Sequence, residues 1–72
     1  MKQIKLKLEV DPDANAGYIE LSRALNSADK PRQIVIDDKR LNGEIVVDVN
    51  SSGHVLGIEF IGVREMLPRL PS

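Results

Sequence analysis

The chain has 72 residues, no cysteine, one Tyr and one Phe as its only aromatic residues, and ten Lys and Arg against eleven Asp and Glu, so its formal net charge is −1. This length predicts one small domain over residues 1–72 with marginal stability, and the missing thiols exclude disulfides and cysteine-ligated metals. The balanced charge and few aromatic side chains argue against nucleic-acid binding, which normally requires a basic excess and a base-stacking surface.

The N-terminal residues include lysines, but no continuous apolar segment follows them. This pattern is unlike a secretory signal peptide, and no apolar run approaches the roughly 20 residues that a membrane span needs. Together with the absence of cysteine, these features predict a soluble cytoplasmic protein without a membrane partner.

The first predicted element is a half-buried strand over residues 2–10, where apolar and charged residues alternate strictly. Residues 11–17 then break the pattern and predict a turn or a single helical turn, because Pro12 presets φ and Gly17 tolerates a positive φ. Alternation resumes over residues 18–23, which we interpret as a strand. A helix over residues 18–25 is the alternative, although its apolar residues do not form one clean stripe.

The next segments predict a loop, a strand and a turn. Residues 26–31 form the loop, since the residue before Pro31 is pushed away from helical geometry. Residues 33–37 are a short apolar strand, and residues 38–43 form a charged connection that ends in the turn signal Asn42-Gly43.

Residues 44–61 give the clearest prediction, a β-hairpin with strands 44–50 and 54–61. Its turn at residues 51–53 places Gly53 where a short hairpin loop favours the left-handed conformation, and Gly57 permits a close approach to the backbone. The two strands should oppose their apolar residues in one core layer: Ile45, Val47 and Val49 against Leu56, Ile58 and Phe60. The tail, residues 63–72, has room for one helical turn before Pro68.

These elements predict a mostly β fold, an antiparallel five-stranded meander, flat or curled, with at most a short C-terminal helical turn. Residues 34–36 and 45–47 place β-branched side chains on both faces of the sheet. A sheet with one face in water should alternate more cleanly. We therefore expect either a curled sheet or a second face that meets another chain, with self-association preferred for so small a domain.

Two segments, residues 11–21 and residues 44–61, resemble the YuzE-like family of small bacterial domains of unknown function. The first follows an Asp-Pro-acidic-Ala-Asp-Ala-apolar-Tyr-Ile-x-Leu pattern, and the second follows an apolar strand, a polar turn and a Gly-Ile-Glu strand. This sequence departs from the pattern at Asn15, where Asp is usual, and at Gly17, where an apolar residue is usual. The resemblance implies an antiparallel β-rich fold without an established activity, cofactor or catalytic residue, and relatives that accompany toxin-like partners.

Two polar segments are weak candidates for a chemical role. Asp11, Asp13, Asn15 and Gly17 alternate as in a calcium loop, but the bidentate Glu that such a loop needs is replaced by Ser22, so a plain turn is expected. His54, the only histidine, lacks a recognisable nucleophile and is expected at the solvent edge.

Charged residues supply two further candidates. Asp48 and Glu59, with Glu20 beside them, should project from the less apolar face of the hairpin, where paired carboxylates can transfer protons or hold Mg²⁺. A solvated polar face is the preferred interpretation, because no cleft or partner base is visible. Lys39 and Arg40 more readily form a solvated edge than a nucleic-acid site.

The sequence therefore favours a non-enzymatic protein-interaction module that forms a homo-oligomer or binds a partner as an antitoxin does. No catalytic, metal or cofactor residues are assigned, and no nucleic-acid partner is expected. The alternative is a small-ligand-binding or metal-assisted hydrolytic domain that uses the clustered carboxylates. The candidate interaction face consists of Val46, Asp48, Val55 and Glu59.

Overall fold

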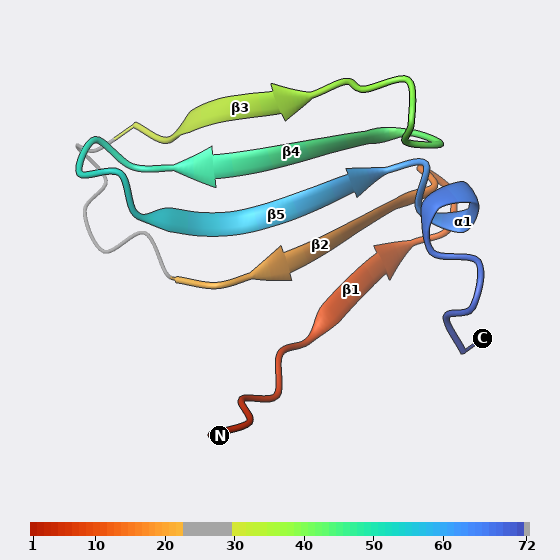
Figure 1. The fold of residues 1–72 in the computed structure, drawn as a ribbon, viewed down its shortest axis with the longest axis horizontal. Coiled ribbons are helices and arrows are strands. Elements are labelled where there is room, and N and C mark those ends of the chain that lie inside the picture. Colours follow the sequence, from red (N-terminus) through yellow and green to blue (C-terminus); the bar gives the residue numbers. More distant parts are fainter. Residues whose placement is uncertain (23–29, 72) are drawn as a thin grey trace.

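The computed structural model describes residues 1–22 and 30–71, which form one five-stranded sheet and one helical turn. All neighbouring strands are antiparallel, in the order β1-β2-β5-β4-β3 (Figure 1). The predicted mostly β class with a short C-terminal helical turn is confirmed. The elements are β1 (Leu8–Asp11), β2 (Ala16–Glu20), β3 (Arg32–Ile36), β4 (Glu44–Val49), β5 (Val55–Ile61) and α1 (Val63–Met66).

The order of the strands differs from the sequential order of a simple meander. β3, β4 and β5 follow one another across the sheet, but β2 pairs with β5 and not with β3. The longest strand, β5, thus lies at the centre of the sheet and β3 at one edge. The local alternation of side chains is the same for either order, so the sequence pattern could not distinguish them.

The β4–β5 hairpin is confirmed with its predicted turn. Asn50 closes the turn, since its carbonyl oxygen accepts from the Gly53 N–H at 3.0 Å and its side-chain oxygen accepts from the backbone N–H of Ser52 and His54. Gly53 has φ +81°, the left-handed conformation that the turn requires. The apolar residues of the strands oppose one another as expected, with Ile45 opposite Phe60.

A β-bulge changes one part of that hairpin. Asp48 pairs with Gly57, but Val49 pairs with Val55, so Leu56 has no directly opposed residue. The predicted opposition of Val49 and Leu56 is therefore wrong, because the extra residue shifts the register at this end.

The first strand is shorter than predicted, because β1 begins at Leu8 and residues 2–7 lie outside the sheet. A strand needs a hydrogen-bonded neighbour. Leu8 pairs with Ile19, and β2 ends one residue later, at Glu20, so the residues before Leu8 have no described strand beside them.

The second predicted strand is confirmed as a strand and not a helix, but it begins at Ala16. The left-handed residue of the preceding turn is Asn15, with φ 52°, and not Gly17. The predicted loop at 26–31 and the end of the predicted 18–23 strand extend into residues 23–29, outside the described residues.

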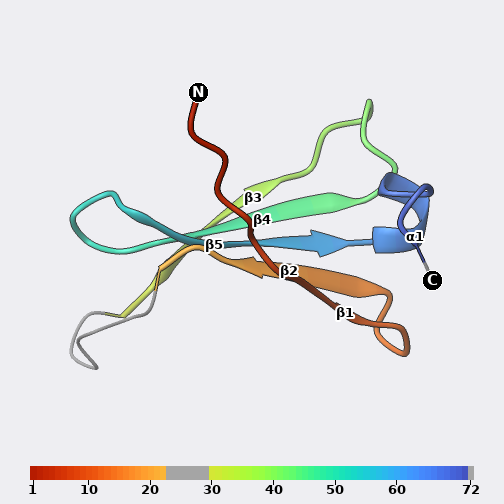
Figure 2. The ribbon, with the colours of Figure 1, turned by 90° about the horizontal axis from the view of Figure 1, so that it is seen from below.

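The sheet is a single twisted layer (Figure 2). Its two faces differ in the polarity of their side chains. Directly paired residues share a face and neighbours along a strand alternate, so the pairings define both. The apolar face consists of Leu8, Val10, Gly17, Ile19, Arg32, Ile34, Ile36, Ile45, Val47, Val49, Ile58 and Phe60. The polar face includes Glu9, Asp11, Tyr18, Glu20, Gln33, Val35, Glu44, Val46, Asp48, Gly57, Glu59 and Ile61.

The core is small. Among the described residues, the buried apolar side chains are Val46, Leu56 and Val63, which are 5%, 8% and 2% exposed. Helix α1 packs on the apolar face at one end of the sheet, where Val63 and Leu8 lie against Gly17. In the described ranges 1–22 and 30–71, no helix has the length and apolar character to cross a membrane.

Candidate functional site

Asp48, Glu59 and Glu20, the carboxylates predicted as candidates, share the polar face. They lie in two rows of paired residues that run across β2, β5 and β4. One row is formed by Glu20, Gly57 and Asp48, and the next by Tyr18, Glu59 and Val46. Asp48, Glu59 and Glu20 therefore lie on one face, as their sequence pattern predicts.

Tyr18 connects the two outer strands of these rows. Its hydroxyl group donates a hydrogen bond to Asp48 Oδ2 at 3.2 Å. The phenol passes over Gly57, where a Cβ atom would overlap both the hydroxyl oxygen and the ring carbon that bears it. The close approach predicted at Gly57 is thus confirmed, and the group that approaches is Tyr18.

Burial on the polar face raises the pKa of Tyr18 above its ordinary value, and the hydrogen bond to Asp48 raises it further. The negative charges of Asp48, Glu20 and Glu59 act in the same direction, because they disfavour a phenolate. Tyr18 is therefore a neutral hydrogen-bond donor and not a nucleophile. Sequence reasoning missed it as a site residue, because Tyr18 and Gly57 are far apart in the chain. The glycine inside a predicted strand signalled a close approach but did not identify the group that approaches.

In the described part of the chain, the carboxylates line two separate hollows. Glu20 and Asp48 line a hollow of about 350 Å³ together with Tyr18 and Ser22. Glu59 lines a different hollow of about 340 Å³ along β1 and β2. Within residues 1–22 and 30–71, no three histidine or acidic side chains are grouped so that they could hold a metal ion.

The turn at residues 11–15, whose side chains alternate as in a calcium loop, is held by hydrogen bonds to its own backbone. Asp11 Oδ1 accepts from the backbone N–H groups of Asp13 and Ala14 at 3.1 and 3.3 Å. This is the local Asx bonding expected of a plain turn.

Asn15 joins that turn to the C-terminal helix. Its amide nitrogen donates to both carboxylate oxygens of Glu65, at 2.9 and 3.1 Å. Its side-chain oxygen accepts from the backbone N–H and Nε of Arg64, and its carbonyl oxygen accepts from Gly62 and Val63. Asn15 thus satisfies backbone donors at the start of α1 that no helical carbonyl can reach.

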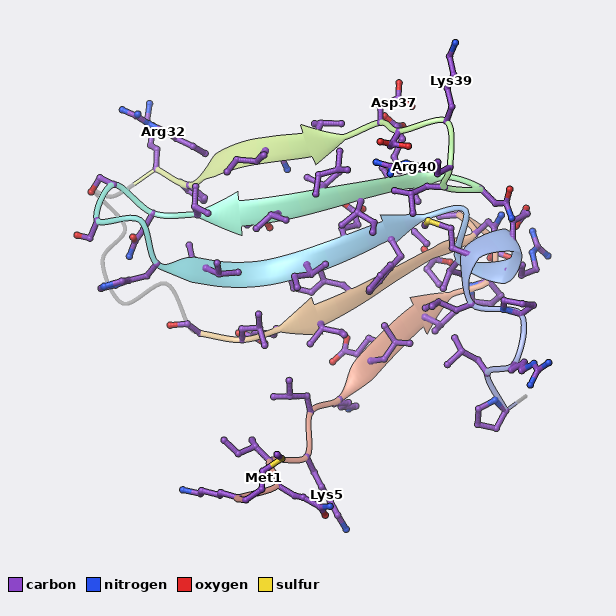
Figure 3. The ribbon with its side chains drawn as sticks, in the orientation of Figure 1. Met1, Lys5, Arg32, Asp37, Lys39 and Arg40 are labelled. Carbon is purple, nitrogen blue, oxygen red and sulfur yellow. The ribbon has the colours of Figure 1, made fainter. Side chains whose placement is uncertain are left out.

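The remaining charged candidates lie at exposed positions. His54 is exposed and bonds to the turn through its backbone N–H. Arg40 forms an ion pair with Asp38 at 2.9 Å. The hydrogen bonds that the Arg40 side chain and backbone N–H donate to the Asp38 carboxylate hold the pKa of Asp38 below its usual value. Figure 3 shows Lys39 and Arg40 in the connection after β3, at the opposite end of that strand from Arg32.

The predicted interaction face is uneven in exposure. Val46 is buried and Val55 is exposed, while Asp48 and Glu59 are half-buried. The opposite, apolar face exposes large side chains, among them Val10, Ile34 and Ile36.

Next to α1, an apolar hollow of about 780 Å³ was not anticipated from the sequence. It is lined by β1, the helix and the C-terminal residues, among them Leu8, Val10, Val63, Leu67, Leu70 and Pro71.

A comparison with known protein families matches residues 7–64 to the family described as "Protein of unknown function (DUF2283)". The chain belongs to this family. A search of curated proteins and a search of solved structures found no match.

The residues that match the DUF2283 family contain all five described strands and the start of α1. They include Tyr18, Gly57 and Asp48, as well as Asn15 and Arg64. Glu65 and the C-terminal residues that line the apolar hollow lie beyond the match.

Proposed function

We propose that this chain is a non-enzymatic protein-interaction module whose apolar face is covered by protein when it functions. The observation that carries the proposal is the uncovered apolar face of a single-layer sheet. On this face, Ile34 and Ile36 of the edge strand β3 are 54% and 41% exposed, and Val10 of the other edge strand, β1, is 46% exposed. Large exposed apolar patches mark interaction sites in small proteins.

The size of the core supports this proposal. Few side chains in the described part of the chain are fully buried, and a domain of this length rarely gains more than about 3–5 kcal/mol from one core. Full burial of one Val, Leu or Ile side chain contributes about 1.5–3 kcal/mol. Covering several apolar-face residues would therefore add as much stability as the core itself supplies.

The apolar face is a better contact surface than the face predicted from the sequence. On the polar face, Asp48 already accepts the hydrogen bond of Tyr18, and Val46 is buried within the chain. Val55 is exposed, and it lies at the bulged end of the β4–β5 hairpin, where it pairs with Val49 of the apolar face. We keep this bulged end as a secondary contact.

The resemblance to the YuzE-like family supports a more specific proposal for the cellular role. We propose a cytoplasmic bacterial protein whose apolar face masks the active surface of a toxin-like partner or joins copies of the chain. Neither role requires a catalytic residue.

The proposal is tested by purification of the tagged chain from its native host with two matched variants. Ile34 and Val35 are neighbours on the same edge strand, are 54% and 55% exposed, and point to opposite faces. A protein bound through the apolar face should be retained by wild type and Val35→Lys and lost with Ile34→Lys. Recovery of the chain as a lone monomer in every preparation would contradict the proposal.

A second candidate function is small-ligand or metal-assisted hydrolytic chemistry at Asp48. The hollow that contains Tyr18, Glu20 and Asp48 favours it, since a phenol and two carboxylates can orient a polar ligand. Titration with Mg²⁺, followed by NMR, should shift the signals of Glu20 and Asp48, and Asp48→Asn should abolish the shift. Unchanged spectra at millimolar Mg²⁺ would exclude the metal-assisted form.

A further inference from the structure

We propose that the protein covering the apolar face is a second copy of this chain, packed face to face as a two-layer β-sandwich. This inference rests on the proposed function and names its partner. Paired sheets pack about 10 Å apart with their inner side chains interdigitated, and this chain contains only one of the two layers.

The chain exposes more surface than a folded monomer of its mass usually does. A folded monomer of 8.0 kDa exposes on average roughly 4,500 Å², whereas this chain exposes 6221 Å². Part of the excess belongs to residues 1–7, which leave the sheet at β1 (Figure 3). The total excess, roughly 1,700 Å², exceeds the approximately 800 Å² that each partner buries in a standard interface.

The distribution of charge favours the apolar face as the contact surface and a second copy of the chain as the partner. Among the five strands that the structure describes, Arg32, at the start of β3, is the one charged residue on the apolar face. A two-fold interface places the same surface on both sides, so an uncharged surface can meet its own copy without repulsion. The charged strand residues of the polar face are all acidic, so two such faces would repel each other: Glu9, Asp11, Glu20, Glu44, Asp48 and Glu59.

The position of α1 determines which part of the face is available. Val63 lies against Gly17 and Leu8, so the helix covers the end of the face near the β1–β2 turn. Ile34 and Ile36 on the other edge strand remain exposed. We therefore place the centre of the dimer over β3, β4 and β5, with the α1 of each copy at the rim.

The first experiment measures mass in solution by light scattering and sedimentation at micromolar concentration. Wild type and Val35→Lys should have twice the chain mass of 8.0 kDa. Ile34→Lys should weaken the dimer at least tenfold, or about 1.4 kcal/mol, because it buries two unpaired ammonium groups. A wild type that is monomeric at tens of micromolar, or a dimer that survives Ile34→Lys, overturns the inference. The second result would indicate pairing between edge strands.

A second measurement remains informative if Ile34→Lys fails to fold. Because the chain has no cysteine, Ile34→Cys and Val35→Cys each provide one site for a nitroxide label. In mixtures with ¹⁵N-labelled wild type, the Ile34→Cys label should broaden signals of Ile45, Val47 and Ile58, and the Val35→Cys label should not. Equal broadening from both labels, or none, contradicts face-to-face packing.

The two proposals fail separately. If the pure chain is monomeric but a different protein is lost with Ile34→Lys in the purification from the host, the apolar face is an interaction surface and the second-copy inference is wrong. If the chain is monomeric and no protein is bound, both are wrong.

Discussion

Gly57 and Tyr18 are the residue pair on which the polar face depends. The phenol occupies the space that a Cβ at position 57 would need, and the Ile19 carbonyl oxygen is 3.0 Å from the same point. Gly57→Ala should therefore lower the free energy of unfolding by about 1–3 kcal/mol, measured by urea denaturation. In a Tyr18→Ala background, the same substitution should cost much less. An equal cost in both backgrounds would assign the strain to the Ile19 carbonyl instead.

The Tyr18 hydroxyl group gives a second prediction, in the alkaline range. The pKa of Tyr18 in the folded chain is above its ordinary value of 10.0, so the unfolded chain loses this proton first as the pH rises. Its contribution to stability is complete below pH 10 and is lost as the pH rises through the folded pKa. Tyr18→Phe should be less stable at pH 7 by about 1 kcal/mol, and the difference should shrink above pH 10. A difference that stays constant across this range would contradict the prediction.

At the scale of elements, Asn15 connects the β1–β2 turn to α1. Asn and Asp are both among the residues that adopt a left-handed φ such as the 52° of Asn15, so Asn15→Asp mainly changes the side-chain bonds. The variant loses the donor to Glu65 and sets two carboxylates against each other, while the acceptor for Arg64 remains. It should cost about 1 kcal/mol of unfolding free energy at neutral pH.

The control for this prediction is Glu65→Gln, which restores a neutral partner at the other end of the bond. In that background, Asn15→Asp should cost little. A cost that is unchanged by Glu65→Gln, again measured by urea denaturation, would show that Glu65 does not couple to position 15.

At the scale of the whole molecule, the open apolar face predicts that stability depends on concentration. If two copies fold as one unit, association stabilises the native state by mass action, by about 1.4 kcal/mol for each tenfold rise in protein concentration. The urea midpoint of wild type and Val35→Lys should therefore rise with concentration, and that of Ile34→Lys should not. Between 5 and 50 micromolar the native state of wild type should gain about 1.4 kcal/mol. Equal urea midpoints at these two concentrations would contradict this prediction.

Structural features that depend on nearby residues were predictable from the sequence. Gly53 in its turn, the opposition of Ile45 and Phe60, and the helical turn before Pro68 were all predictable, because each depends on one hairpin or on one short segment of the chain. The site was predictable only in part. The shared face of Asp48 and Glu59 follows from alternation along each strand, but their separation into two hollows does not.

The approximate position of each strand, the hairpin and the side chains that share a face along a strand could be predicted from the sequence, since alternation with period two needs no tertiary information. Long-range contacts were needed to place β5 between β2 and β4, to leave residues 2–7 without a strand partner, and to join Asn15 to α1. These features arise from contacts between residues distant in the chain, such as Tyr18 with Asp48. A local pattern specifies which side chains share a face, but the neighbour that a strand selects depends on the packing of the whole sheet.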